Sequence, residues 1–271
     1  PKSLDEAIAL LGDGSWRLIA GGTDFYPAQG TRPIRDYVLD LNALDELRGI
    51  SETHTHYVFG ARTSWSEIAA ARHLSPAFEA LRMAAREVGS IQVQNTGTIA
   101  GNLCNASPAA DGVPPLLVLD AEVELRSASG ARYLSVGEFI LGNRLTVRRP
   151  YELVTAIRVP KAAAKGRSHF VKLGARRYLV ISIAMAAVRV VGDASGRIEE
   201  AAIAVGACAP VAKRIAGLEA AMKGAAPGEL EALVAGYSFD ELQPIDDVRA
   251  TADYRRQAAR EIVSRAVLAS L

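Results

Sequence analysis

The residues LIAGGTDF, at positions 18–25, join a short apolar run to a pair of glycines. The apolar run predicts a β-strand, and Gly21 and Gly22 let the backbone after it turn sharply and approach a ligand closely. Consecutive N–H groups at such a turn can hold a phosphate, and the hydroxyl of Thr23 can add a donor. The carboxylate of Asp24 would repel a diphosphate, so we expect it to bind backbone N–H groups or a ribose hydroxyl. A tight turn without a ligand is the alternative.

Two more loops of small polar residues follow, NTGTIAGN at 95–102 and ASPAAD at 106–111. The first can face the glycine pair and hold the other side of a pyrophosphate, or it is simply a polar loop. In the second, Pro108 fixes one φ angle, and Ser107 and Asp111 can hydrogen-bond to ribose hydroxyls. Asp111 also precedes an apolar run, where it can cap a helix. The ribose and capping interpretations are compatible with each other.

A fourth candidate is the basic segment from Lys172 to Tyr178, which contains Arg176 and Arg177. Its cations can bind an anion such as phosphate, although a charged strand edge is the simpler explanation of these residues alone. The sequence offers no convincing Ser-His-Asp or Cys-His set, so nucleophilic catalysis is not indicated. The first glycine turn has neither G-x-G-x-x-G nor G-x-x-x-x-G-K-[ST], which argues against an independent nicotinamide site.

Composition excludes several classes of protein. The 271 residues carry a net charge of +1, which gives no electrostatic reason to expect nucleic acid or an anionic membrane as a partner. No run of about 18 apolar residues is present, so we expect no membrane-spanning helix. The two cysteines, Cys104 and Cys208, are too few for a four-cysteine iron–sulfur cluster within the chain. Their number and separation predict no disulfide framework and a reducing, cytoplasmic setting.

The apolar pattern divides the chain near residue 165. Residues 1–165 alternate predicted strands and helices, interrupted at 89–115 by an irregular stretch whose length is typical of functional loops. Residues 166–271 begin with three predicted strands and end in helices. We therefore predict an α+β chain whose second domain is a three-stranded sheet with helices.

Together, these segments resemble the FAD-binding, or medium, subunits of the xanthine dehydrogenase and carbon monoxide dehydrogenase family of molybdenum hydroxylases. The resemblance rests on LIAGGTDF, NTGTIAGN and ASPAAD, then on Phe170-Val171-Lys172 with Arg176, and on YRR at 254–256. These motifs follow the family's order along nearly the whole chain. They imply a two-lobed, vanillyl-alcohol-oxidase-type (PCMH-type) FAD-binding domain over 1–165. They also imply a flavoprotein C-terminal domain of the carbon monoxide dehydrogenase type over 166–271.

The resemblance also implies which residues bind FAD. Gly21, Gly22 and Thr23 would meet the pyrophosphate from one side, and Thr98, Gly101 and Asn102 would meet it from the other. Asp111 would hold the ribose or adenosine part, Val154 would touch the adenine side, and Lys172 would lie by the flavin. The loop after Lys172 would approach the isoalloxazine ring and set access for an electron acceptor. The full implied set is Leu18, Ile19, Ala20, Gly21, Gly22, Thr23, Asp24, Phe25, Thr98, Ile99, Ala100, Gly101, Asn102, Asp111, Val154 and Lys172.

The family further implies partners and a role. A small subunit would carry two [2Fe–2S] clusters, and a large subunit would carry the molybdopterin at which the substrate is oxidised. The complex would be a dimer of heterotrimers. Electrons would pass from the iron–sulfur clusters to FAD, and then to NAD⁺, a quinone or another acceptor. Two alternatives stay open: a self-sufficient flavin oxidoreductase of the same fold, and a non-catalytic assembly subunit that has lost FAD.

Overall fold

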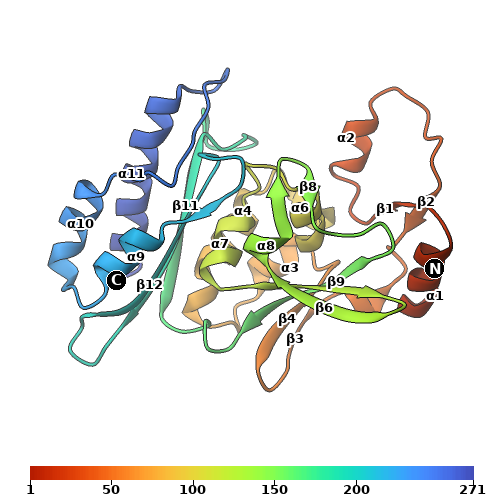
Figure 1. Ribbon diagram of the computed structural model, residues 1–271, viewed down its shortest axis with the longest axis horizontal. Helices are drawn as coiled ribbons and strands as arrows, with labels where there is room; N and C mark the ends of the chain where they lie inside the picture. Colours follow the sequence, from red (N-terminus) through yellow and green to blue (C-terminus); the bar gives the residue numbers. More distant parts are fainter.

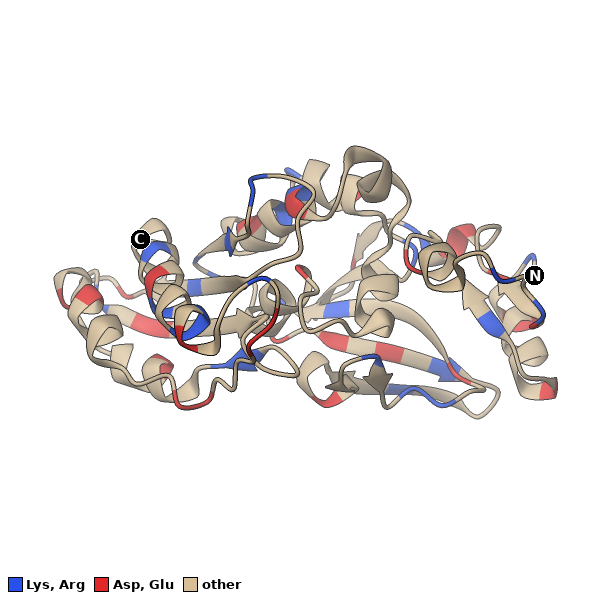
Figure 2. Cartoon of the chain, turned by 90° about the horizontal axis from the view of Figure 1, so that it is seen from above, with Lys and Arg blue, Asp and Glu red and all other residues tan.

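The computed structural model describes residues 1–271 and arranges them around two large antiparallel sheets with helices between them (Figure 1). A small N-terminal lobe lies at one end of the molecule, and the C-terminal helices lie at the other. Blue and red segments are interspersed along the whole chain, as expected from its small net charge (Figure 2). This is the mixed α+β architecture that the sequence predicts.

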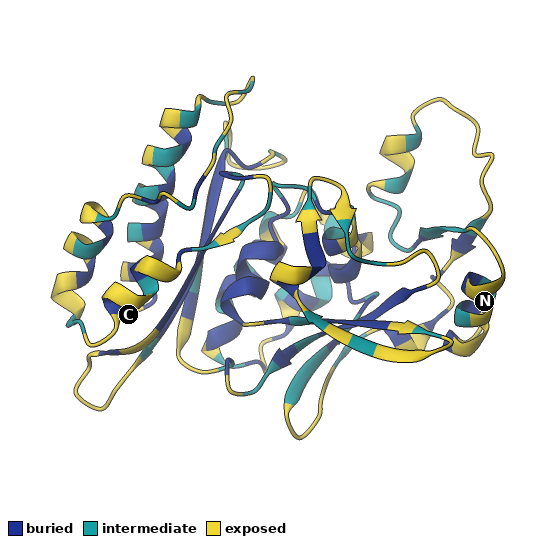
Figure 3. Cartoon of the chain, in the orientation of Figure 1, coloured by how far each residue is buried: buried dark blue, intermediate teal, exposed yellow.

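The N-terminal lobe has a core made almost entirely of leucine. Its two strands pair in parallel, and the first strand leads directly into the glycine pair. No residue of its second helix is buried, and this helix stands away from the body of the molecule (Figure 3). The elements are α1 (Leu4–Asp13), β1 (Arg17–Ile19), α2 (Phe25–Gln29), β2 (Val38–Asp40) and a 3-10 turn (Asp45–Leu47).

The second lobe is built on a five-stranded antiparallel sheet in the order β3-β4-β9-β5-β6. The central strand β9 is almost continuously buried, because helices cover one face and neighbours flank both edges. The sequence pattern predicts β4, β5 and β9 but not the outer strands, whose residues are largely exposed. The strands are β3 (Ile50–Glu52), β4 (His56–Gly60), β5 (Glu122–Ser127), β6 (Gly130–Ser135) and β9 (Leu153–Pro160).

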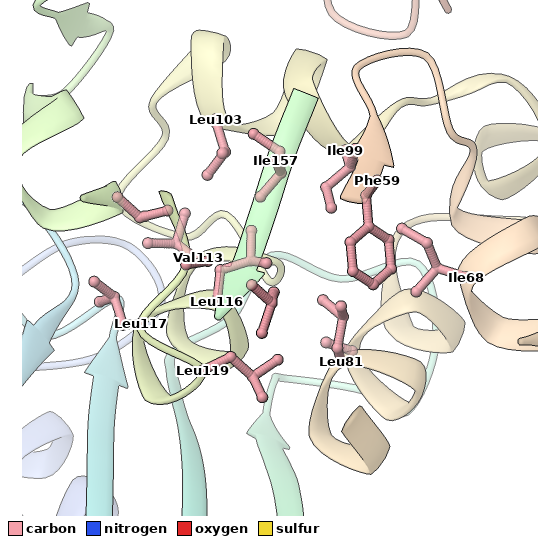
Figure 4. Close-up of a cluster of buried hydrophobic side chains, with 14 of the residues drawn as sticks. Phe59, Ile68, Leu81, Ile99, Leu103, Val113, Leu116, Leu117, Leu119 and Ile157 are labelled. Atoms are coloured by element: carbon pink, nitrogen blue, oxygen red, sulfur yellow. The ribbon is translucent and has the colours of Figure 1, made fainter. Parts of the chain in front are cut away.

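The predicted irregular stretch at 89–115 is wrong in part, because three short helices occupy much of it. Each is seven residues or fewer, too short for a helical period to be read, and side-chain caps from Ser90 and Thr98 begin two of them. Ile99 and Leu116 from these helices point into one buried cluster with Phe59 (Figure 4). The remaining elements of this lobe are α3 (Trp65–Ala70), a 3-10 turn (Pro76–Phe78), α4 (Glu79–Glu87), α5 (Ile91–Thr96), α6 (Ile99–Asn105), α7 (Val113–Val118), α8 (Val136–Phe139), β7 (Ile140–Gly142) and β8 (Leu145–Thr146).

The C-terminal sheet has four antiparallel strands, so the prediction of three is wrong by one. The extra strand has two residues, Lys213–Arg214, and therefore carries no readable apolar alternation. One face of the sheet packs on the C-terminal helices, and the other packs on α4 and α7. The elements are β10 (Arg167–Leu173), β11 (Ala184–Gly192), β12 (Ile198–Gly206), β13 (Lys213–Arg214), α9 (Ala216–Met222), a 3-10 turn (Pro227–Glu229), α10 (Leu230–Gly236) and α11 (Ala252–Ala269).

The two halves share a hydrophobic core. Phe170, Met185 and Ala204 from the C-terminal sheet belong to the same buried cluster as the helices of the second lobe. The fully buried guanidinium of Arg189 crosses the junction, where its Nε donates to the carbonyl of Val118 at 2.7 Å. The C-terminal sheet is therefore packed into the second lobe and is not an independent attachment.

Candidate cofactor-binding site

The glycine loop after β1 presents a row of free backbone donors. The N–H groups of Gly21, Gly22, Thr23 and Asp24 donate to no acceptor within the chain. Gly22 has a φ of +72°, a left-handed conformation that side chains disfavour, so the turn depends on a glycine there. Unpaired N–H groups on successive residues form the kind of concave surface that binds phosphate oxygens. The structure thus supports the phosphate-binding interpretation of this loop over a plain turn.

The second loop contacts the first directly but offers fewer free donors. A Cβ built on Gly21 would lie 1.8 Å from the carbonyl oxygen of Thr96, so the two backbones touch. The N–H groups of Ile99 and Ala100 donate to carbonyls of the segment that follows β4, and that of Gly101 donates to the Thr98 hydroxyl at 3.0 Å. This loop therefore has mainly side chains left to offer a ligand.

One side chain of the second loop lacks a partner. The Oδ1 atom of Asn102 is buried and accepts no hydrogen bond. It lies beside Gly112, where a Cβ would come within 2.8 Å of it. A buried amide oxygen without a donor is costly, so its position fits a ligand hydroxyl or N–H.

The carboxylate of Asp24 turns away from the free N–H groups. Its Oδ1 accepts a hydrogen bond from Asn105 Nδ2 at 2.9 Å, and the side-chain Oδ1 of Asn105 accepts one from Arg144 Nη1. Asp24 and Arg144 thus lie at the two ends of one chain of hydrogen bonds. This arrangement keeps the negative charge from facing a bound phosphate. The expected contact of Asp24 with backbone N–H groups is not formed.

A polar cavity of about 230 Å³ lies where the two loops meet. It is smaller than the ~300–1,000 Å³ typical of sites for drug-sized ligands, so it suits part of a dinucleotide. Four residues of its wall, Asn42, Arg48, Arg62 and Ser64, are not predicted as site residues from the sequence, because they lie outside the glycine-rich motifs. The full lining is Ala20, Gly21, Asn42, Arg48, Arg62, Ser64, Asn95, Thr96 and Thr98.

Several residues of the implied FAD set have side chains in the core. Ile19, Ile99, Ala100 and Val154 are all at least nine-tenths buried among apolar neighbours. Their side chains position the loops, and any contact with a cofactor falls to their backbone atoms. Leu18 and Phe25, at the two ends of the first motif, are half-buried. The guanidinium of Arg17 lies 4.3 Å from the centre of the Phe25 ring.

Asp111 and Lys172 form a buried pair that the sequence does not reveal. Lys172 Nζ lies 2.6 Å from one carboxylate oxygen of Asp111, and Ser182 Oγ donates to the other at 2.8 Å. Lys172 also donates to the Glu87 carbonyl at 3.2 Å. Burial raises the pKa of the Asp111 carboxyl, and the Lys172 charge opposes that shift. The helix-cap interpretation is wrong, because α7 begins after Gly112 without a side-chain cap.

The Asp111–Lys172 pair holds the base of the loop that precedes β11. Ser182 ends this loop, and Tyr178, Leu179 and Ile181 on it are exposed large apolar residues. Arg176 does not face an anion, because its guanidinium donates to the carbonyls of Tyr178 and Leu179 within the loop. A direct ribose contact for Asp111 stays a prediction, since both its oxygens already accept hydrogen bonds.

No three or more His, Cys, Asp or Glu side chains come together as a group able to hold a metal ion. None of the helices combines the length and the apolar character that crossing a bilayer requires. The arrangement as a whole offers phosphate-binding groups next to a polar cavity whose lining has hydroxyl, amide and guanidinium side chains but no His, Cys, Asp or Glu. Its chemistry is that of holding a nucleotide cofactor.

Two family models together match almost the whole chain. The FAD-binding domain in molybdopterin dehydrogenase matches residues 1–162, and the CO dehydrogenase flavoprotein C-terminal domain matches residues 169–270. The carbon monoxide dehydrogenase medium chain of Hydrogenophaga pseudoflava is 30% identical over 100% of this chain and 95% of its own length. The glyceraldehyde dehydrogenase medium chain of Sulfolobus acidocaldarius is 31% identical over 98% and 94% respectively. A solved carbon monoxide dehydrogenase from H. pseudoflava superimposes with a TM-score of 0.90 at 31% identity, covering 100% of this chain and 95% of the other.

The fold, the free N–H groups and these matches define an FAD-binding flavoprotein. The chain belongs to the FAD-binding subunits of the xanthine dehydrogenase and carbon monoxide dehydrogenase family, which are flavoprotein subunits of molybdenum-containing oxidoreductases. The predicted family, the PCMH-type fold and FAD as cofactor are confirmed.

Proposed function

We propose that this chain relays electrons through FAD, from [2Fe–2S] clusters on a partner subunit to an external acceptor. The observation that carries the proposal is the row of four free N–H groups beside a polar cavity. Bound FAD supplies the redox chemistry, because flavin accepts and releases electrons. The residues of this chain bind and orient the cofactor, and they supply no acid or base for a substrate.

The proposed partners are an iron–sulfur small subunit and a molybdopterin large subunit, assembled as a dimer of heterotrimers. Support comes from relatives that are named as medium chains, which are parts of larger enzymes. The chain itself has two cysteines, both free, so it has no set of thiolates for an iron–sulfur cluster. The substrate would be set by the large subunit, and we propose the cytoplasm as the compartment.

Within this function we propose that the two parts of the chain bind different parts of FAD, as the motifs imply. Residues 1–165 would bind FAD, with the first glycine loop on the diphosphate and Thr98, Gly101 and Asn102 opposite. Residues 166–271 would close the flavin end through Lys172. The free N–H groups and the orphaned Asn102 oxygen support the first part. The buried Lys172–Asp111 pair supports the second, because it fixes the loop beside β11.

Purification of the chain alone and with its co-expressed partners tests the function. The isolated chain should be yellow and release FAD on heating, yet its flavin should stay oxidised when substrate is added without air. The complete complex should reduce the same flavin. Substrate turnover by the isolated chain would show a self-sufficient oxidoreductase instead. A colourless chain that refuses added FAD would show an assembly subunit.

A further inference from the structure

One arginine in the cavity wall has guanidinium N–H groups that lack close acceptors. Arg62 lies just beyond β4, and its side chain is only 10% exposed. Its Nη1 donates to the Leu44 carbonyl at 2.8 Å, while its Nη2 has only a long contact of 3.5 Å with the Asn42 side chain. Its buried Nε has no partner at all. A buried guanidinium N–H without an acceptor is costly, so its presence in a cavity wall points to a ligand.

The charges around Arg62 do not neutralise it. Asp45 is 3.9 Å from Nη1, but its side chain is 97% exposed, so water and salt screen this pair strongly. The other cation in the wall, Arg48, is engaged by Glu67 at 2.9 Å. Arg62 is therefore the desolvated cation of this cavity, and its one carboxylate partner, Asp45, is exposed to solvent.

The surroundings of Arg62 favour an anionic ligand. The same cavity is lined by Gly21, Thr96 and Thr98, from the two loops that touch, and one of its nine lining residues is hydrophobic. A polar wall with a cation and a neighbouring row of N–H groups suits phosphate oxygens and not an aromatic ring. The planar guanidinium fork also matches the geometry of phosphate.

We propose that Arg62 is a cofactor-binding residue that holds the diphosphate of FAD against the free N–H groups of the first glycine loop. The assignment rests on the proposed function, because it takes the cavity beside Gly21 as the place of the diphosphate. None of the sequence motifs contains Arg62. It reaches the site from the end of β4, and the turn at 42–48 orients its guanidinium.

The experiment compares the full-length apo chain with Arg62→Gln and with a matched control, Arg265→Gln, which removes a 69% exposed arginine on α11. Dissociation constants are measured for FAD, for ADP, which keeps the diphosphate, and for riboflavin, which lacks it. Arg62→Gln should weaken FAD and ADP roughly 10- to 100-fold, the loss expected for one hydrogen bond to a charged group. Riboflavin binding should not change, and the control should match the wild type for all three.

A purely structural role for Arg62 predicts different results. It would lower the unfolding midpoint of the apo variant and weaken the binding of riboflavin as much as that of FAD. The proposal is overturned if Arg62→Gln weakens riboflavin and FAD equally, or if it leaves the affinity for FAD unchanged. Arg62→Met keeps the aliphatic stem and serves as a second variant if Arg62→Gln does not fold. Inorganic pyrophosphate must compete with FAD for the wild-type chain, and its failure to compete also overturns the proposal. A wild type that binds neither FAD nor ADP would instead contradict the proposed function.

Discussion

Gly21 and Gly22 are neighbours in the chain, yet they are glycine for different reasons. Gly22 has a φ of +72°, so its backbone conformation disfavours any side chain. Gly21 has no such conformation, but it lies against the carbonyl of Thr96, which leaves no room for a Cβ. The first reason is local and is readable as a turn signal. The second depends on a loop 75 positions later in the chain and is not readable.

Gly21→Ala should therefore separate the two loops. A methyl group 1.8 Å from the Thr96 oxygen forces the backbones apart, which we expect to destabilise the chain by about 1–3 kcal/mol. FAD should be lost on gel filtration, because the diphosphate would no longer lie between two fixed loops. Gly12→Ala is the matched control, since a Cβ there meets nothing within 4 Å. Urea unfolding and flavin content measure both effects, and full flavin retention in Gly21→Ala would contradict the loop contact.

Asp111 shows the limit of reading a residue from its motif. The sequence allows a ribose ligand or a helix cap, and the structure instead gives it Lys172 and Ser182 as partners. Lys172 is 61 positions away and Ser182 is 71 positions away, so only the packing of the C-terminal sheet on the second lobe brings the three together. The pair fixes the position of the cation that is proposed to lie by the flavin.

Elements with a clear apolar alternation were predictable, and short or exposed ones were not. β11 and β12 each have nine residues with largely buried side chains, and the sequence predicts both. The helices α5, α6 and α7 each have six or seven residues, which is too short for the helical spacing of apolar residues to be recognised. Side-chain caps begin α5 and α6, and α5 packs on α3, α6 on β9, and α7 on β11 and β12. Tertiary packing of this kind, more than helix propensity, stabilises such short helices.

One charged contact joins β6 to the residue just before β9, across the intervening strand β5. Glu152 accepts two hydrogen bonds from Arg132, at 2.6 and 2.8 Å, and one from the Arg149 N–H at 2.7 Å. Burial would raise the pKa of the Glu152 carboxyl, but the bonds from Arg132 and Arg149 outweigh it and lower that pKa. A lowered pKa means that this contact stabilises the fold above the unfolded-state pKa and is lost as the pH falls through the folded-state value.

Glu152→Gln should consequently remove part of the acid sensitivity of the chain. At neutral pH we expect the variant to lose about 1–3 kcal/mol of unfolding free energy, as charged hydrogen bonds become neutral ones. Below about pH 4.3, the unfolded-state pKa of glutamate, the difference from the wild type should shrink. Urea unfolding from pH 7 to pH 3 measures this, with the exposed Glu261→Gln as control. A difference that stays constant with pH would contradict the assignment.

At the scale of the whole molecule, the sequence boundary near residue 165 runs through a shared core, although a second core of 21 residues lies wholly beyond it. Phe170, Met185 and Ala204 from beyond the boundary are buried with residues of the second lobe. Arg189 donates across the junction, and the Asp111–Lys172 pair also crosses it. Folding of either half should therefore depend on the other, even though the family models divide there.

We expect the apo chain to unfold in a single calorimetric transition. Phe170→Ala should shift the whole transition to lower temperature, because it opens a cavity in the shared core at a cost of about 3–5 kcal/mol. Scanning calorimetry of both proteins is the measurement. Two resolved transitions in the wild type, with Phe170→Ala moving only one of them, would show that the halves fold independently.

The order of glycine loops, strands and helices depends on residues that are close together in the chain. The sequence alone was therefore enough to predict the α+β class, the FAD-binding family and the two glycine loops. Turn chemistry and apolar periodicity act over a few residues, and a motif keeps its spacing whatever surrounds it. The tertiary structure decided which distant groups meet: Arg62 beside Gly21, Lys172 on Asp111, and the C-terminal sheet against α7. Such contacts depend on packing across the whole chain, because desolvation and hydrogen-bond geometry exist only once the sheets have closed on the helices between them.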